Sequence, residues 1–256
     1  MTSTAQPAEQ ALRVREIGVD RPWVWLQSGW SDLCSAPAVA LTYGALLVAV
    51  SFALTLGLWL AGFLYLLLPL AAGFMFVGPV LATGFYEVSR RLEQGQKPSL
   101  AAALRAWRAN PGQIAGMGVI LMLLLLAWIR IAFLIFALFF GLQPPSWDHL
   151  VSAVFFSAQG VPFLIVGTIV GGALAAVAFA ISAVAIPILM DRNAGIPTAV
   201  AASVSAVLRN WRVMIGWGAL IVLFTAAGIL TFYIGLAITL PLIGHATWHA
   251  YRDLIA

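Results

Sequence analysis

Residues 33–86 contain no Asp, Glu, Lys, Arg or His. As one helix, this stretch would be about 80 Å long, more than twice the roughly 30 Å hydrocarbon core of a bilayer. It therefore predicts two membrane spans, at about 38–60 and 64–86, with a tight turn near Gly62. The whole chain fits this environment, because 62% of its 256 residues are hydrophobic and only 9% are charged. Soluble domains carry about 25% charged residues.

The remaining apolar segments predict four further spans. The first, at about 113–141, is interrupted only by Arg130 and is followed by the turn signal at 141–145. The charge-free run at 150–190 is too long for one span, and it divides near Gly160 into a short amphipathic piece and a span at about 162–190. The last run favours two short spans, at about 212–229 and 233–250, although one over-long tilted helix is a competing interpretation.

These spans predict an all-α membrane protein with six transmembrane helices. The predicted organisation is a disordered tail at 1–15 and a single polytopic membrane domain at 16–256. With six spans, twelve of the 13 Lys and Arg residues lie on one side of the membrane, and only Arg130 is left over. Short loops rich in Lys and Arg stay in the cytoplasm, so both termini are predicted to be cytoplasmic.

The basic balance of the chain, with a net charge of +4, points to anionic lipid headgroups at the cytoplasmic face. The basic residues form short clusters beside apolar runs, which is the pattern of lipid contact, and no nucleic-acid partner is predicted. Cys34 is the single cysteine. It excludes an intramolecular disulfide and is interpreted as a passive cytoplasmic thiol.

An internal repeat is the second organising signal. Segments rich in Trp and Arg, at about 20–32, 98–108 and 197–212, precede the first, third and fifth spans, and each even-numbered span contains a Pro near its end. The sequence thus predicts three repeated helical hairpins, each preceded by a cytoplasmic amphipathic interfacial helix, with Ser99 as an N-cap. Such repeats underlie many transporters but also occur in proteins without a transport path.

Arg130 and Glu87 are the candidate functional polar residues. Arg130 lies within an apolar span, where a charge costs roughly 2.5–3.5 kcal/mol at the centre. Three interpretations remain open for it: its side chain snorkels to the outer headgroups, pairs with a buried polar group, or faces a substrate. Glu87 follows the second span and is most simply an interface-terminating charge.

His245 and His249 are four residues apart and therefore share one helix face. Two imidazoles at this spacing are candidate metal ligands, but a complete site needs more, and the nearby Glu87, Asp191 and Asp253 have no diagnostic spacing. An aromatic, hydrogen-bonding cap at the interface is the favoured interpretation. No cofactor is predicted, since the sequence lacks nucleotide, hydrolase and metalloprotease motifs.

Gly167 and Gly171 form a GxxxG spacing, which predicts close packing of the fourth span against a neighbour. That neighbour is more simply another helix of the same chain than the partner of a homodimer. A second spacing of this kind is formed by Gly112 and Gly116.

Three segments resemble a bacterial family of integral membrane proteins, DUF2189. They are the block from Val77 to Glu93, the stretch from Ala106 to Pro111, and the C-terminal stretch from Gly244 to Asp253. The resemblance extends over about 15–256 and implies a bacterial inner-membrane protein without an assigned activity. Family members are sometimes labelled as similar to cytochrome c oxidase subunit I, which needs about twelve spans and six His ligands. Six predicted spans and three His cannot build that subunit.

The sequence favours a non-enzymatic scaffold or assembly partner of a membrane complex, with a membrane protein or a second copy as partner. No span shows the paired buried charges that ion coupling usually leaves. A small transporter or permeation protein is the alternative, based on the repeat, the prolines and Arg130. A weaker alternative is a metal or haem accessory protein that uses His245 and His249.

Overall fold

The computed structural model describes residues 12–63, 66–141 and 147–256. Within these residues the chain is helical, and extended backbone pairs only at the antiparallel bridge between Val14 and Ile255. The prediction of an all-α protein is confirmed. Of the tail predicted at 1–15, residues 1–11 lie outside the described part, while the backbone of Arg15 donates to the carbonyl of Leu254 at 2.9 Å.

Four helices in the described residues are long and apolar enough to cross a membrane. They coincide within two residues with four of the predicted spans: α2 (Pro37–Leu60), α6 (Pro111–Phe140), α8 continued by α9 (Gly160–Ser182 and Ala185–Asp191), and α11 (Trp211–Leu230). Pro37 and Pro111 stand in the first turn of their helices, where an N–H has no intrahelical partner to lose. The break between α8 and α9 lies just before Pro187, whose ring disfavours a continuous helix there.

Shorter helices occupy the other two predicted spans. The 15 residues of α3 (Leu67–Leu81) extend about 22 Å, less than the hydrocarbon core. The chain then starts α4 (Thr83–Glu93), and the Thr83 hydroxyl donates to the Val80 carbonyl across the junction. α12 (Leu236–Leu254) contains Pro241 and buried polar side chains. Helix length therefore does not confirm six crossings.

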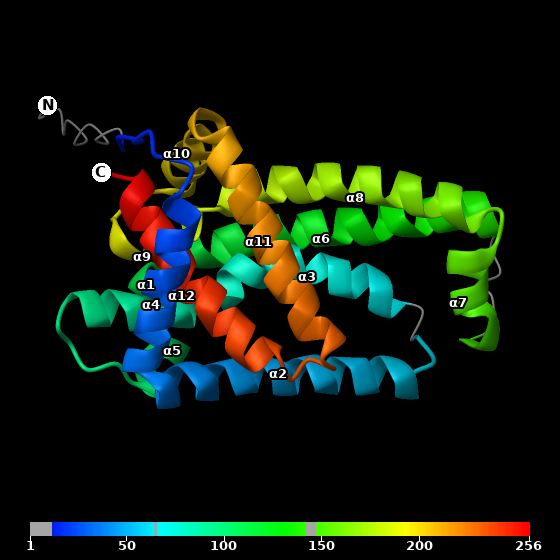
Figure 1. The fold of residues 1–256 in the computed structure, drawn as a ribbon, viewed down its shortest axis with the longest axis horizontal. Coiled ribbons are helices and arrows are strands. Elements are labelled where there is room, and N and C mark those ends of the chain that lie inside the picture. Colours follow the sequence, from blue (N-terminus) through cyan, green and yellow to red (C-terminus); the bar gives the residue numbers. More distant parts are fainter. Residues whose placement is uncertain (1–11, 64–65, 142–146) are drawn as a thin grey trace, which may run out of the picture.

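The last apolar run forms two helices rather than one tilted helix. The chain reverses between α11 and α12, where Phe232 and Tyr233 adopt positive φ angles of 52° and 65°. Between α6 and α8, α7 (Trp147–Phe156) lies at the far end of the long helices (Figure 1).

Helices are present where interfacial segments were predicted. They are α1 (Arg21–Ser35), α5 with a short 3-10 turn (Leu100–Leu104 and Ala106–Ala109), and α10 (Ile196–Arg209). The predicted N-cap is confirmed, since the Ser99 hydroxyl accepts from the Ala102 N–H. One face of α1 packs against α12 and buries Trp25, while Trp23 and Trp30 remain exposed.

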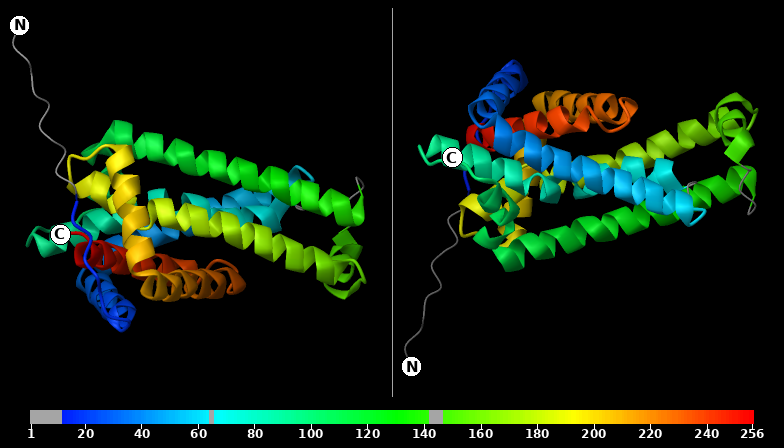
Figure 2. Two further views of the ribbon diagram at one scale, coloured as in Figure 1. Left: turned by 90° about the horizontal axis from the view of Figure 1, so that it is seen from above. Right: turned by 90° about the horizontal axis from the view of Figure 1, so that it is seen from below.

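The long helices form two groups (Figure 2). In the first lobe, α3, α6 and α8 pack on one another, and in the second lobe, α12 packs on α2 and α11. The lobes are joined at the end that carries both described chain ends, here called the closed end, where α1, α4, α9 and α10 gather (Figure 1). The largest fully buried side chains include Trp25, Trp217, Trp248 and Tyr251, all in this region. Along the long helices many large apolar side chains are exposed, as expected where lipid is the solvent.

Glycines allow the close approach of α1 and α2 to α12. A Cβ on Gly29 would lie 2.7 Å from the backbone N of Ala246 and 2.9 Å from the carbonyl O of Leu242. A Cβ on Gly44 would lie 2.7 Å from the carbonyl O of Ala237. Backbone atoms cannot move aside as a flexible side chain does, so these contacts depend on the missing Cβ.

We expect Gly29→Ala to push α1 away from α12 and to cost roughly 1–3 kcal/mol, as overpacking usually does. The measurement is the thermal unfolding midpoint of the purified protein in detergent. Gly57→Ala on α2 is the matched control, because no atom lies within 4 Å of its added Cβ and Ala favours helix more than Gly does. Equal midpoints for the two variants would contradict the close-packing argument.

Candidate functional site

The buried polar groups of the closed end gather around α12. His245 is fully buried, and Thr247 and Trp248 are almost so. Polar side chains buried in a low-dielectric interior need hydrogen-bond partners. Thr247 bonds to the Ile243 carbonyl of α12 itself. The other partners come from α1, α4 and α9, which are far from α12 in sequence.

Asp32, Ser89, His245 and His249 form a continuous hydrogen-bonded chain, here called the polar chain. The Ser89 hydroxyl donates to Asp32 Oδ2 at 2.6 Å, and His249 Nε2 lies 2.8 Å from the same oxygen. His245 Nδ1 lies 2.8 Å from the Ser89 oxygen. The two His residues therefore share one face of α12, and α1 and α4 supply the groups that bind them.

This geometry assigns the tautomer of His245. The Ser89 hydroxyl has one hydrogen, which it donates to the Asp32 carboxylate, so its oxygen must accept from His245 Nδ1–H. Nε2 is then left with its lone pair. It is buried and has no hydrogen-bond partner among the described residues, and the Phe85 ring packs edge-on at 5.6 Å between centroids.

The two His side chains do not present a joint metal site in this arrangement. His249 Nε2 is bound to Asp32 and His245 Nδ1 to Ser89, so the nitrogens do not converge on one point. The described residues hold no group of three or more His, Cys, Asp or Glu arranged for a metal ion. The polar chain also differs from the catalytic triad of serine hydrolases. In a triad the His lies between the Ser and the acid, whereas here Ser89 lies between Asp32 and His245.

The other acidic candidates are paired elsewhere. Glu87 is buried and forms ion pairs of 2.8 Å with Arg90 and 2.7 Å with Arg91, both within α4. Asp253 accepts from Trp25 Nε1 and pairs with Arg21 at 2.6 Å.

Asp191 accepts from the Tyr251 hydroxyl at 2.6 Å. Burial, followed by this hydrogen bond, raises the pKa of Tyr251 to about 12. Tyr251 therefore stays protonated at neutral pH and continues to donate to Asp191.

The sequence did not point to Asp32 and Ser89 as partners of the histidines. Both residues have ordinary local contexts, one near the end of α1 and the other within α4. Their meeting with His245 depends on how α1 and α4 pack on α12, which no spacing in the sequence encodes.

Arg130 is exposed on α6, away from the residues that line the central cavity. It has no ion pair or hydrogen bond within the described part of the chain. Its neighbours on the exposed side of α6 are large apolar side chains, here called the α6 stripe: Val119, Met122, Leu123, Leu126, Phe133, Leu134 and Leu138.

The GxxxG residues of α8 differ in their surroundings. A Cβ on Gly171 would meet the Trp128 ring of α6 at 2.8 Å, whereas Gly167 has open space. Trp128 in turn donates to the Pro69 carbonyl at 2.9 Å. Gly171 thus serves packing within the first lobe. Of the second pair, Gly116 approaches Ile196 and Gly112 faces open space.

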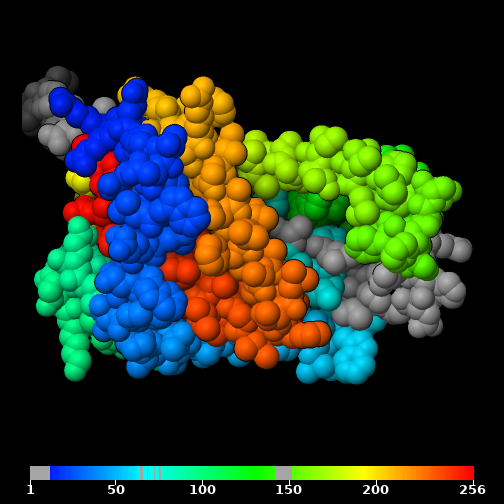
Figure 3. Space-filling view, viewed as in Figure 1, coloured from blue at the N-terminus to red at the C-terminus, as the bar shows by residue number. Residues whose placement is uncertain are grey.

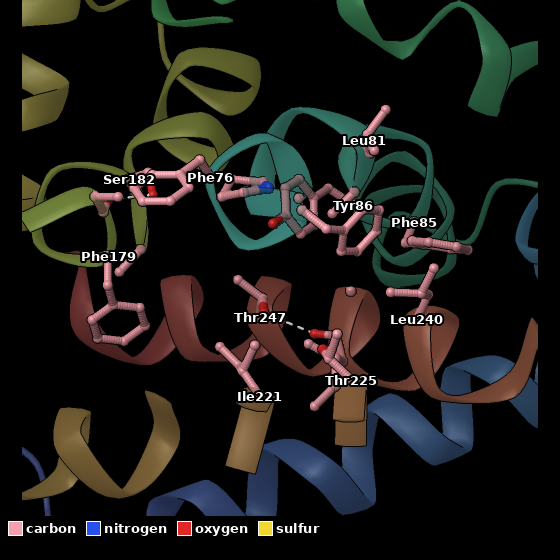
Figure 4. Close-up of a pocket in the computed structure, with 18 of the residues that line it drawn as sticks. Phe76, Leu81, Phe85, Tyr86, Phe179, Ser182, Ile221, Thr225, Leu240 and Thr247 are labelled. Atoms are coloured by element: carbon pink, nitrogen blue, oxygen red, sulfur yellow. Dashed lines mark hydrogen bonds between the residues drawn. The ribbon is translucent and has the colours of Figure 1, made fainter. Parts of the chain in front are cut away.

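A cavity of about 110 Å³ lies between the two lobes (Figure 4). Residues of α2, α3, α4, α8, α11 and α12 line it, and none of them is charged. Among the lining side chains, Tyr86, Ser182, Thr225 and Thr247 carry hydroxyls.

We expect Ser89→Ala to destabilise the closed end, because it removes the hydroxyl that pairs with the buried His245 Nδ1 and one of the two contacts of the half-buried Asp32. Leaving such groups unsatisfied costs about 1–3 kcal/mol. The thermal unfolding midpoint in detergent is the readout. Ser35→Ala serves as control, since the Ser35 hydroxyl is exposed and bonds only to the Ser31 carbonyl. An unchanged midpoint for Ser89→Ala would show that the polar chain contributes nothing to stability.

No curated protein and no solved structure matches the chain. A family model described as a predicted integral membrane protein matches residues 67–191. This segment runs from α3 to the end of α9, so it includes the first lobe and α4 but not the C-terminal stretch of the resemblance. The predicted resemblance to the DUF2189 family of predicted integral membrane proteins is thus confirmed over residues 67–191.

Proposed function

We propose that the protein is a non-enzymatic scaffold or assembly partner of a membrane complex. The observation that carries this proposal is the placement of Arg130. It lies exposed in the middle of the apolar α6 stripe, without an ionic partner in the described residues. A cation at membrane depth requires an anionic or polar group, and here that group must come from outside the described chain.

The polar groups at the closed end support a structural role. Asp32, Glu87, Asp191 and Asp253 are all held in hydrogen bonds or ion pairs within the chain. The central cavity contains no charged side chain that might couple to an ion or a proton. Groups that are paired in this way hold helices in place and leave no free carboxylate at the cavity.

We further propose six crossings, made by three repeated units of an interfacial helix and a hairpin, in a bacterial inner membrane. The turn near Gly62 and the reversal after α11 support hairpins. Arg108 stacks over Trp107 at 5.4 Å, and Arg212 over Trp211 at 5.1 Å. Exposed Arg–Trp pairs suit the headgroup region, where the ring meets apolar chains and the guanidinium meets phosphate.

Cys34 tests the orientation, because it is the single cysteine and its side chain is exposed on α1. With cytoplasmic termini, a membrane-impermeant maleimide should label Cys34 in inverted vesicles and not in intact spheroplasts. The control is Cys34→Ala combined with Ala61→Cys, which places the thiol at the opposite turn and should reverse the pattern. Labelling of Cys34 from outside would overturn the proposed orientation.

Arg130 tests the scaffold proposal. We expect a photo-crosslinking residue at Leu126 or Leu134, which flank Arg130 on the α6 stripe, to give a discrete protein adduct in native membranes. Arg130→Leu should reduce the adduct roughly three- to twentyfold, since one polar contact between membrane helices contributes about 0.6–1.7 kcal/mol. Arg130→Lys should retain it.

The matched control is the same crosslinker at Ile169, which is exposed on α8. A protein adduct that is equal at all three positions, or that is insensitive to Arg130→Leu, would show that Arg130 does not bind a partner. Adducts with lipid alone would favour snorkelling to outer headgroups and would end the scaffold proposal.

A small transporter is the second candidate, and the cavity between the lobes is the observation that favours it. The lobes meet mainly at the closed end, an arrangement in which two bundles can rock against each other. Arg130 contributes nothing to that path, because it lies on the outer face of α6. The weaker proposal of a metal or haem accessory protein has only the free Nε2 of His245 to support it.

A further inference from the structure

The cavity between the lobes has two hydroxyls without an intramolecular partner. Tyr86 is 3% exposed and Thr225 is 8% exposed, and both line the cavity. Neither hydroxyl has a hydrogen-bond partner in the described residues. The residues are buried, but their hydroxyl oxygens are not among the fully buried unpaired atoms, so both oxygens are accessible from the cavity to a bound molecule.

The other two cavity hydroxyls, those of Ser182 and Thr247, form hydrogen bonds within their own helices. Ser182 donates to the Ala178 carbonyl at 2.6 Å, and Thr247 donates to the Ile243 carbonyl at 2.7 Å, each one turn back in its own helix. Thr225 stands in the middle of α11 but makes no such bond. Its hydroxyl and that of Tyr86 remain available to a bound molecule.

The chemistry of the cavity restricts the class of that molecule. No lining residue is charged, so an ionised ligand would stay unpaired in a low-dielectric site, which is costly. Two free hydroxyls can donate to carbonyl oxygens. Phe74, Phe76, Phe85 and Phe179 are among the lining residues. Figure 4 shows Phe76, Phe85 and Phe179 on different sides of the cavity. A neutral ring with carbonyl groups meets all three conditions.

Size points to one ring rather than a whole lipid. An apolar cavity of about 150 Å³ can bind benzene, and the space here is about 110 Å³. The space is thus smaller than the one that binds benzene, so it has room for one ring at most, and a substituted ring requires the walls to move outward. Any long tail must lie outside it.

A path for such a tail exists between α8 and α11. The two helices belong to different lobes, and the surface is recessed between them (Figure 3). Both helices carry exposed apolar side chains, including Val177 on α8 and Val222 on α11. In a membrane, a tail placed here would lie among lipid chains.

We propose that the cavity binds the ring of a neutral, lipid-soluble carbonyl compound of the quinone class. Tyr86 and Thr225 donate hydrogen bonds to its carbonyl oxygens, and its tail leaves between α8 and α11 into the bilayer. The site goes beyond the scaffold function, because a scaffold needs no ligand in its core. It also does not involve Arg130, so each proposal can fail without the other.

The test is equilibrium binding of radiolabelled decylubiquinone, a benzoquinone with a short tail, to the full chain in lipid nanodiscs. Saturable binding with one site per chain is expected. Tyr86→Phe and Thr225→Val should each raise the Kd roughly three- to tenfold, the effect of one lost hydrogen bond. Ala178→Leu should abolish binding by filling the cavity.

The matched control is Thr247→Val, which makes the same chemical change at a hydroxyl already bonded to its own helix, and its Kd should equal that of the wild type. If the unfolding midpoint shows that Ala178→Leu does not fold, the Kd values of Tyr86→Phe and Thr225→Val alone test the proposal. Equal Kd values for wild type, Tyr86→Phe and Thr225→Val would overturn the proposal. So would the absence of saturable binding, or full competition by a saturated phosphatidylglycerol, which would identify an acyl chain as the occupant.

Discussion

The packing of α12 in the middle of the closed end is the constraint on which the rest of the structure depends. Among the helices of the two lobes, α12 has the most polar C-terminal half. It nevertheless has the largest number of buried residues, including His245, Trp248 and Tyr251. Gly29 and Gly44 let α1 and α2 approach its backbone, and Gly244 lets the Phe85 ring approach from α4. Because α12 is enclosed so closely, its polar side chains need partners within the protein. His245, Trp248 and Tyr251 find them on neighbouring helices.

That requirement explains where the acidic residues of the closed end lie. Asp253 binds Trp25 of α1, Asp191 binds Tyr251, and Asp32 joins Ser89 and His249. Each contact links α12 to a different helix, namely α1 or α9, and Asp32 also joins α1 to α4. The acidic groups are thereby used for assembly, and the cavity between the lobes is left with hydroxyls as its only polar side-chain groups. A neutral cavity beside a highly charged end follows from the same packing.

Apolar length and proline position were sufficient to predict the four long helices. Their ends coincide with the predicted spans because a charge-free run at this length has few alternatives in a membrane, and Pro37 and Pro111 mark where two of them begin. The second predicted span proved shorter, since the helix is interrupted after Leu81 and a new helix carries Glu87. The ion pairs of Glu87 could also be predicted from the sequence, because Arg90 and Arg91 follow it by three and four residues on the same helix. The polar chain was not accessible, because Asp32 and His245 meet only after α1 docks on α12.

Within the described residues, His245 Nε2 and Thr239 Oγ1 are buried without a hydrogen-bond partner. Arg130 and two of the cavity hydroxyls also have no partner there, and they lie in different places. Arg130 points outward from α6, and the free hydroxyls of Tyr86 and Thr225 lie at the cavity between the lobes. In a coupled transporter the charge that drives transport and the groups that bind the substrate share one path. Here the cation is exposed on α6, a helix that supplies no residue to the cavity lining. The cation therefore suits a contact with another membrane component, and the cavity suits a neutral molecule held within the chain. This separation favours a protein that assembles with a partner while holding a ligand over one that moves a charged substrate.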